Sequence, residues 1–204
     1  MPLAPLLFLC ACKPNIIATI APELLTQTPQ QDPKEARKLA FEKKRKAIMG
    51  QPYPALKFTK GHGTFDEDSY VGKVVLFDFF AHWCGPCIAS FPEMEKMYAD
   101  LQPKGLRVVG ITKYYGYYGK ENREKRDMPQ DTEFDRMGDF IKAHKIPWPV
   151  MYGGADNFEA YGCDAIPFVV VIDKQGNIRN IKIGYDPQHF DEFRKQIEGL
   201  LAEK

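Results

Sequence analysis

An apolar run that leads directly into two closely spaced cysteines constrains this chain more than any other feature. Residues 74–80 read Val-Val-Leu-Phe-Asp-Phe-Phe, and β-branched and aromatic residues in such a run are typical of a buried strand. Residues 88–101 then carry apolar side chains at helical spacing. Cys84 and Cys87 therefore lie where a strand gives way to a helix.

This placement predicts redox chemistry at the two cysteines. A thiolate rather than a thiol attacks a disulfide, and the free N–H groups and dipole of a helix N-terminus favour the charged form of Cys84. Cys87 lies one helical turn further on, close enough to form a disulfide with Cys84 or to resolve a mixed disulfide made by it. Gly85 and Pro86 keep the turn tight, and proline costs no hydrogen bond in the first turn of a helix.

One carboxylate interrupts the apolar run. Asp78 lies six residues before Cys84. A buried carboxylate is costly unless it is paired or used, and burial raises its pKa. In one interpretation Asp78 is the proton acceptor that helps Cys87 to ionise when the mixed disulfide is resolved. In the other it is an aspartate that is hydrogen-bonded for structural reasons.

The rest of the chain alternates strands and helices. The pattern predicts strands at 73–80, 106–112, 147–152, 167–172 and 178–183, helices at 86–101, 131–145 and 187–202, a helical turn at 157–161, and a small hairpin within 56–65. Strand–helix–strand units pair in parallel, and the last hairpin adds an antiparallel edge. We therefore predict an α/β fold with a central mixed sheet flanked by helices.

We divide the chain into three parts. Residues 1–30 form a signal-like or spacer segment, residues 31–49 a charged helical linker, and residues 50–204 the α/β domain. The linker helix has Asp32 as its predicted N-cap and Pro33 in its first turn. Its run of basic residues is interpreted as a solvated helix face.

The first residues resemble a bacterial lipoprotein signal. Leu9-Cys10-Ala11-Cys12 is similar to a cleavage box in which Cys12 would carry the lipid anchor. No Lys or Arg precedes the apolar run, so the usual basic region of a signal is missing. The alternative interpretation is a misassigned start or a missing upstream segment.

Composition argues against several classes of function. A net charge of +1 gives no general attraction to nucleic acid or to an anionic membrane. Five cysteines are too few for a disulfide scaffold. One C-x-x-C and four scattered histidines do not make the ligand set of a structural zinc site. We expect no metal and no organic cofactor, only a redox-active Cys84–Cys87 disulfide.

Two separate motifs resemble the thioredoxin fold. Trp83-Cys84-Gly85-Pro86-Cys87 looks like the active site of thioredoxin-fold oxidoreductases. Residues 161–167, Tyr-Gly-Cys-Asp-Ala-Ile-Pro, followed by the apolar run 168–172, are similar to the cis-proline strand of that fold. The resemblance implies that Pro167 is cis and that Ile166 pairs its backbone with the substrate chain. It also implies that the residues around the two sulfurs form the substrate-binding surface, namely Trp83, Gly85, Pro86 and Pro167.

The long stretch between Cys87 and Pro167 resembles a subgroup of that fold. An extra helix and strand are inserted there, as in the TlpA/ResA-like branch, which is related to AhpC/TSA proteins. That branch is mostly bacterial, exported and membrane-anchored. The resemblance implies a monomer outside the cytoplasm, with protein disulfides or dithiols as substrates and a membrane thiol carrier as electron donor. A cytoplasmic location is the alternative.

The expected function is that of a thiol–disulfide oxidoreductase. Cys84 attacks the substrate disulfide, Cys87 resolves the mixed disulfide, and Asp78 accepts the proton of Cys87. The Gly85-Pro86 dipeptide resembles reducing members of the fold, so we expect net reduction of protein disulfides. One alternative is a peroxiredoxin-like peroxide reductase, although the Pro-x-x-x-Thr/Ser-x-x-Cys pattern is missing before Cys84. Another is a non-catalytic module that handles metal or haem through its dithiol.

Three neighbouring features allow two interpretations each. Cys163 is either a third redox thiol or, as we expect, a small buried hydrophobic residue. His82 either stabilises the Cys84 thiolate or, as its position at a strand end predicts, is exposed to solvent. The tyrosine-rich loop at 113–130 either shapes a substrate groove or covers a small cluster of its own.

Overall fold

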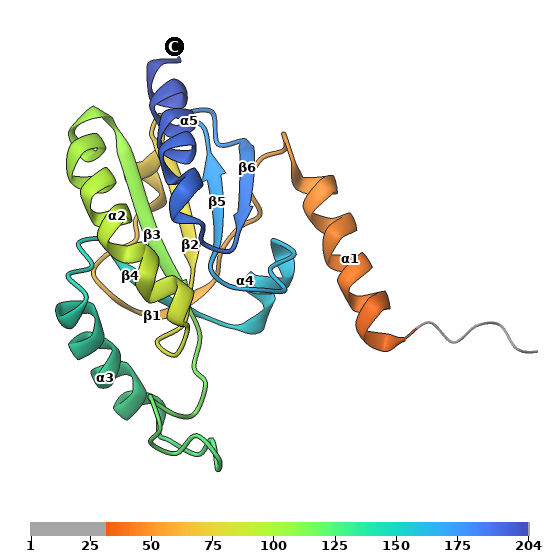
Figure 1. Ribbon diagram of the computed structural model, residues 1–204, viewed down its shortest axis with the longest axis vertical. Coiled ribbons are helices and arrows are strands. Elements are labelled where there is room, and N and C mark those ends of the chain that lie inside the picture. Colours follow the sequence, from red (N-terminus) through yellow and green to blue (C-terminus); the bar gives the residue numbers. More distant parts are fainter. Residues whose placement is uncertain (1–31, 204) are drawn as a thin grey trace, which may run out of the picture.

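The computed structural model describes residues 32–203, and these form one mixed six-stranded sheet with helices on both faces (Figure 1). The strand order is β1-β4-β3-β2-β5-β6. The strands are β1 (Phe58–His62), β2 (Val74–Phe79), β3 (Leu106–Thr112), β4 (Val150–Gly153), β5 (Phe168–Ile172) and β6 (Ile178–Ile183). The predicted signal segment at 1–30 and the predicted lipid site at Cys12 lie outside the described residues.

The sheet has a parallel centre and antiparallel edges, as the sequence predicts. β2 pairs in parallel with β3, and β3 with β4. β5 runs antiparallel to β2, with Phe79 opposite Phe168, and β6 runs antiparallel to β5. β2 and β3 therefore end, and β5 begins, at the same end of the sheet. The site residues gather there.

Five α-helices cover the sheet. They are α1 (Pro33–Ile48), α2 (Gly85–Leu101), α3 (Gln130–Ala143), α4 (Ala155–Ala160) and α5 (Phe190–Ala202), with short 3-10 helices η2 (Glu67–Tyr70), η3 (Gln102–Lys104) and η4 (Pro187–His189). Side chains of α2, α3 and α5 share one core with Leu76 and Phe80. Side chains of α1 and α4 share the other core with Phe77 and Phe79. Burying an apolar side chain of this size contributes about 1.5–3 kcal/mol, so both faces of β2 anchor the fold.

The two helix starts that matter for the site follow from their capping residues. At α1 the Asp32 side chain accepts a hydrogen bond from the Lys34 N–H (3.0 Å), and Pro33 occupies the first turn. At α2 the cap is Cys84, and Pro92 lies inside the helix. The predicted bounds of both helices agree with the structure to within a residue or two at each end.

The predicted hairpin within residues 56–65 is wrong. β1 instead pairs with β4, with Phe58 opposite Gly153 and His62 opposite Val150. Gly61, which the predicted hairpin would place in its turn, lies inside β1, and a Cβ there would collide with the Met151 Sδ. A glycine that allows close approach of a neighbour looks the same in sequence as a glycine in a turn.

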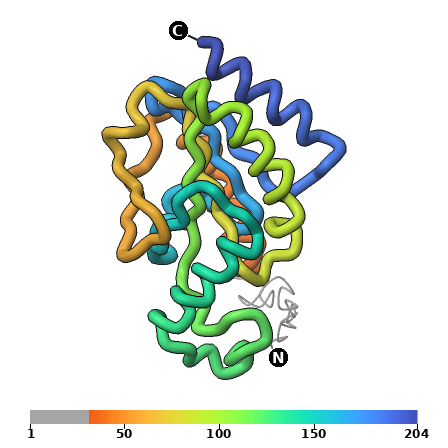
Figure 2. The backbone as a smooth tube through the Cα atoms, turned by 90° about the vertical axis from the view of Figure 1, so that its left-hand side faces the viewer, coloured from red at the N-terminus to blue at the C-terminus, as the bar shows by residue number. Residues whose placement is uncertain are grey.

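The segment between β3 and α3 forms an ordered loop beyond the end of the sheet, drawn in green at the bottom of Figure 2. Tyr118 and Glu121 exchange backbone hydrogen bonds of 3.1 and 2.9 Å, and the Met128 N–H donates to the Gly116 carbonyl (2.9 Å). This tyrosine loop, residues 113–129, closes over the end of β3.

Candidate active site

The two cysteines of the C-x-x-C are bonded to each other at the start of α2. The Cys84–Cys87 bond has an S–S distance of 2.04 Å. Cys84 is the N-cap of α2, and its sulfur accepts a hydrogen bond from the Cys87 N–H (3.2 Å). This contact shows how a Cys84 thiolate would be held: a backbone N–H and the positive end of the helix dipole both face its sulfur.

The residues flanking the two cysteines are open to solvent, whereas the cysteines themselves are almost fully buried. Cys84 and Cys87 are 4% and 0% exposed. Trp83, Gly85 and Pro86 are exposed, and Trp83 is one of the few large apolar side chains on the surface. A partner that reaches the disulfide would therefore contact this rim first.

Asp78 lies beneath the disulfide-bearing helix. It is on β2, faces α2 and α5, and is 2% exposed. Its Oδ2 has no hydrogen-bond partner among the described residues. Burial raises the pKa of the Asp78 carboxyl to about 7. The group therefore changes charge near neutral pH, which suits a proton acceptor.

A small cavity of about 20 Å³ adjoins Asp78 and reaches Pro167 and Lys182. This volume is enough for about one water molecule. Ser90, Lys182 and Tyr185 also line the cavity, so a water held there would have polar neighbours besides the Asp78 carboxyl.

The proline segment lies just before β5, the strand that pairs with β2. The Ile166–Pro167 peptide bond is cis, as the family resemblance implies. Pro167 is buried and precedes Phe168, which pairs with the end of β2. Ile166 is half-buried and lines the same surface cavity as Trp83. The structure thus places the predicted residues of the C-x-x-C and of the proline strand at one edge of the sheet.

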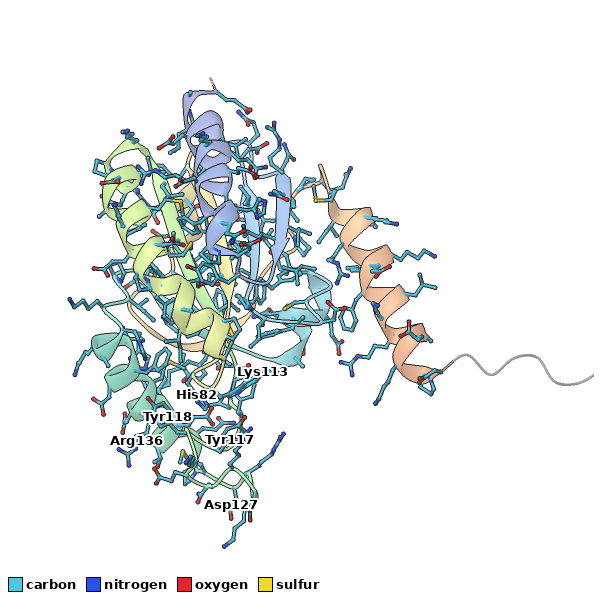
Figure 3. The ribbon with its side chains drawn as sticks, in the orientation of Figure 1. His82, Lys113, Tyr117, Tyr118, Asp127 and Arg136 are labelled. Atoms are coloured by element: carbon cyan, nitrogen blue, oxygen red, sulfur yellow. A yellow bond between two sulfur atoms is a disulfide. The ribbon has the colours of Figure 1, made fainter. Side chains whose placement is uncertain are left out.

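The predicted exposure of His82 is wrong. His82 is buried, and its ring packs against Tyr115, Tyr117 and Tyr118 of the tyrosine loop at centroid distances of 5.7, 5.4 and 4.9 Å. Figure 3 labels His82, Tyr117 and Tyr118 close together below the start of α2. Burial lowers the pKa of His82 to about 4, so the ring is neutral at pH 7. A neutral ring adds no positive charge near the Cys84 thiolate.

Glu133 is a buried carboxylate that was not among the predicted site residues. It is 1% exposed and accepts hydrogen bonds from the N–H groups of Tyr115 (2.8 Å) and Gly116 (2.8 Å). Its Oε1 lies 4.0 Å from the His82 Nε2, beyond hydrogen-bonding distance. Burial raises the pKa of Glu133, and the two N–H groups partly offset this. A signal was present: Glu133 lies one helical turn before Met137, on the apolar face of the predicted helix.

The tyrosine loop packs around a cluster of its own and also lines a surface cavity. Tyr117 is buried and packs on His82. Tyr115 packs edge-on against Trp83 at 5.4 Å and lines the surface cavity that Trp83 and Ile166 share. The loop therefore covers its own cluster and also forms part of the wall beside the disulfide.

Cys163 is a buried free thiol. It is 7% exposed, and its sulfur donates to the Ala165 carbonyl (3.6 Å). Burial raises the pKa of the Cys163 thiol to about 12. A protonated, buried thiol fits the expectation of a small hydrophobic residue.

Neither a metal cluster nor a membrane-spanning helix occurs in the described part of the chain. Among residues 32–203, no three His, Cys, Asp or Glu side chains gather in an arrangement that could hold a metal ion. Within the same range, none of the helices combines the length and apolar character that a membrane crossing requires.

The fold and the site together define a class. A disulfide-bonded cysteine pair at a helix N-terminus, on a thioredoxin-like sheet with a cis-proline before a neighbouring strand, is the site of a thiol–disulfide oxidoreductase. Comparison with known proteins agrees. Residues 48–197 match the model of the Redoxin family, and the chain belongs to that family.

The similar proteins carry related descriptions. The thiol-disulfide oxidoreductase ResA of Bacillus cereus (strain ATCC 10987 / NRS 248) is 25% identical over 160 residues, covering 77% of this chain and 83% of ResA. The thioredoxin-like protein YneN of Bacillus subtilis (strain 168) is 27% identical over 147 residues, covering 71% and 77%. A crystal structure from Chlorobium tepidum, described as the thiol:disulfide interchange protein DsbE, has a TM-score of 0.60 at 25% identity and covers 76% of this chain and 98% of its own.

Proposed function

We propose that this protein reduces disulfide bonds in other proteins, with Cys84 as the attacking cysteine and Cys87 as the resolving one. The observation that carries the proposal is the Cys84–Cys87 pair, bonded at the N-terminus of α2 inside an exposed rim of Trp83, Gly85 and Pro86. In this proposal the disulfide seen here is the end state of one turnover.

The first step uses the reduced dithiol. The Cys84 thiolate attacks one sulfur of a substrate disulfide, so that a Cys84–substrate bond forms and the substrate S–S bond breaks. The second substrate sulfur leaves as a thiolate and takes a proton from solvent. The Cys87 N–H and the helix N-terminus stabilise the thiolate form of Cys84 before the attack.

The second step releases the substrate. Cys87 transfers its proton to Asp78, and the Cys87 thiolate then attacks the Cys84 sulfur. The Cys84–Cys87 disulfide forms, and the remaining substrate sulfur leaves and is protonated. The raised pKa of Asp78, about 7, makes this carboxyl able both to accept a proton and to give it back near neutral pH.

The rim and the proline strand hold the substrate chain in this proposal. Ile166 offers its backbone to the substrate segment, while Trp83, Pro86 and Pro167 contact the residues next to its disulfide. Two electrons must then return to the Cys84–Cys87 pair. The resemblance to exported proteins supports a membrane thiol carrier as donor, a location outside the cytoplasm and a monomeric state.

Insulin reduction with dithiothreitol as donor tests the proposal. The wild type is expected to speed precipitation of the insulin B chain, and Cys84→Ser to abolish that acceleration. Cys87→Ser is expected to accumulate a mixed disulfide that runs as a larger species on a non-reducing gel. Cys163→Ala is the control, because it removes a described thiol outside the pair.

Two results would contradict the proposal. If Cys87→Ser captures no substrate while Cys84→Ser does, the order of attack is reversed. If the wild type leaves insulin disulfides intact but consumes peroxide, or binds metal or haem tightly through the dithiol, the protein is not a protein-disulfide reductase.

A further inference from the structure

A groove runs between α1 and the domain, next to the disulfide. Its volume is about 660 Å³. Trp83 and Ile166, from the rim and the proline strand, line it on the domain side, together with Tyr115. Phe41 and three basic residues of α1 line the opposite side. Any chain bound in this groove would therefore pass beside the Cys84–Cys87 pair.

One half of α1 is docked on the domain. The Arg45 guanidinium donates to the Gly162 carbonyl and to Asp164 Oδ1 (2.8 Å), and Ile48 is buried. A Cβ at Gly162 would come within 2.7 Å of the Phe41 carbonyl oxygen, so the two backbones are in close contact. In Figure 1 the other end of α1 points away from the sheet.

The other half of α1 carries basic side chains on the same helix face as Phe41 and Arg45. Lys34, Arg37 and Lys38 are spaced i, i+3 and i+4, so they lie on the helix face that carries Phe41 and Arg45. All three are exposed and line the groove. Between residues 32 and 203, none of the three has an ion-pair partner.

The domain adds a cation from the opposite wall. Lys113 follows β3 at the edge of the sheet where α2 begins, as its label in Figure 3 shows, and its Nζ lies 4.9 Å from the Phe158 ring centroid. The carboxylates on the groove are Glu159 and Asp164, and Asp164 is already paired with Arg45. Four cations thus face one unpaired carboxylate.

We propose that this groove binds an acidic, extended segment of the substrate protein that flanks the disulfide to be reduced. The inference rests on the proposed function and adds the substrate class. Charge complementarity carries it, because cations from two separate elements converge on one concavity beside the cysteines. Phe41 and Phe158 also line the groove, which suits a polypeptide with both acidic and apolar side chains. A flat membrane surface could not enter the groove.

The test compares disulfide-bonded peptides of equal length whose flanks carry four Glu, four Gln or four Lys. The full chain reduces each peptide with dithiothreitol as donor, and kcat/KM is measured at low salt. The wild type is expected to prefer the acidic over the neutral peptide about tenfold, equivalent to about 1.4 kcal/mol. The preference should largely disappear at about 0.5 M salt, because salt screens exposed charges.

The variant K34Q/R37Q/K38Q is expected to lose most of the acidic-to-neutral ratio, and Lys113→Gln to reduce it by a smaller factor. The matched control is K43Q/K44Q/K46Q, which removes three exposed cations of the same helix that do not line the groove. The control should keep the wild-type ratio. Equal thermal unfolding midpoints would show that all these variants are folded.

Three outcomes would overturn the inference. A wild type that reduces all three peptides equally leaves the proposed function intact but refutes the acidic preference. An equal loss in the control variant means that net charge, rather than the groove, sets the ratio. If K34Q/R37Q/K38Q keeps the ratio but no longer binds vesicles of phosphatidylglycerol and phosphatidylcholine (1:3), these cations serve a membrane. Failure to reduce any peptide would instead contradict the proposed function itself.

Discussion

Two buried ionisable residues near the disulfide have opposite pKa shifts. Burial raises the pKa of Asp78 to about 7 and lowers that of His82 to about 4. Both shifts have the same cause, because an apolar environment penalises whichever form is charged. At pH 7 His82 is neutral, and Asp78 is divided between its two forms. Only Asp78 is therefore suited to exchange protons near neutral pH.

We expect Asp78→Asn to slow resolution of the mixed disulfide by about a hundredfold, a typical loss when a positioned proton acceptor is removed. In the wild type the resolution rate should rise as the pH increases through about 7, because only ionised Asp78 accepts the proton. The variant should lack this inflection. Stopped-flow release of a labelled substrate from the mixed disulfide measures both effects. Glu95→Gln, on α2 but away from the small cavity, is the control.

Asp78→Asn should also stabilise the oxidised protein in a pH-dependent way. Burial raises the folded-state pKa of Asp78 to about 7, so the unfolded state loses this proton first as the pH rises. The folded state then becomes less stable between about pH 4 and pH 7, by up to about 4 kcal/mol. The variant avoids that loss. Urea unfolding without reductant at several pH values should show that Asp78→Asn exceeds the wild type in free energy of unfolding by a margin that grows up to about pH 7. A margin that does not change with pH would contradict a raised pKa of Asp78 in the folded state.

His82→Leu should have the opposite pH dependence. The unfolded state binds a proton at His82 below about pH 6.5, while the folded state does so only below about pH 4. The wild type therefore loses stability as the pH falls through that window, by up to about 3 kcal/mol, and the variant does not. The same urea experiment would show the advantage of His82→Leu increasing toward low pH. An advantage that increases toward high pH would mean that His82 is charged when folded.

At the level of elements, α3 holds the tyrosine loop through one carboxylate. Glu133 ties the backbone of Tyr115 and Gly116, and Gly116 has φ +74°. A Cβ at Gly116 would collide with the Arg126 carbonyl, so the return of the loop depends on this glycine. The loop in turn places Tyr115 against Trp83. The surroundings of Trp83 at the rim thus depend on a side chain of α3.

Glu133→Gln should loosen this loop. It removes charge-assisted hydrogen bonds that are buried, at a cost of about 1.5–3 kcal/mol. Faster amide exchange at Tyr115 and Gly116 is the expected result. Asp131→Asn removes an exposed carboxylate from the same first turn and should leave that exchange unchanged. Unaltered exchange in Glu133→Gln would mean that the loop is held by its tyrosines alone.

At the level of the whole molecule, α1 is attached to the domain mainly through its last two turns. Arg45 supplies the polar anchor and Ile48 the apolar one. The predicted division of the chain at residue 50 stays a prediction. What the structure adds is that the helix before this point has one face directed at the active-site side of the domain.

Arg45→Met should release α1 without unfolding the domain. The loss of hydrogen bonds to a charged group corresponds to about 2 kcal/mol, so protection from amide exchange in residues 41–48 should fall by roughly thirtyfold. Lys44→Met, which removes an exposed neighbouring cation, is the control. A fall of protection throughout the sheet would mean that α1 is part of one cooperative unit with the domain. The acidic-peptide preference should decline together with α1 docking.

Much of the site could be read from residues that are close in sequence. Cys84, Cys87 and Asp78 lie within ten positions, and the local rules for a strand followed by a helix place them together. The resemblance of residues 161–167 to a cis-proline segment added Pro167 to the predicted site, and the Ile166–Pro167 bond is cis in the structure. Glu133 could have been noticed as a charge on an apolar helix face. His82 could not be placed correctly, because the residues that bury it come from a loop more than thirty positions later.

The sequence by itself determined the α/β order, the redox pair and the buried carboxylate, because periodicity and helix capping are local properties of the chain. The tertiary structure alone decided that β1 pairs with β4, that the tyrosine loop buries His82, and that α1 and Lys113 form one basic groove beside the disulfide. These features depend on contacts between residues far apart in the chain. Such contacts follow from how the elements pack, which no local pattern specifies.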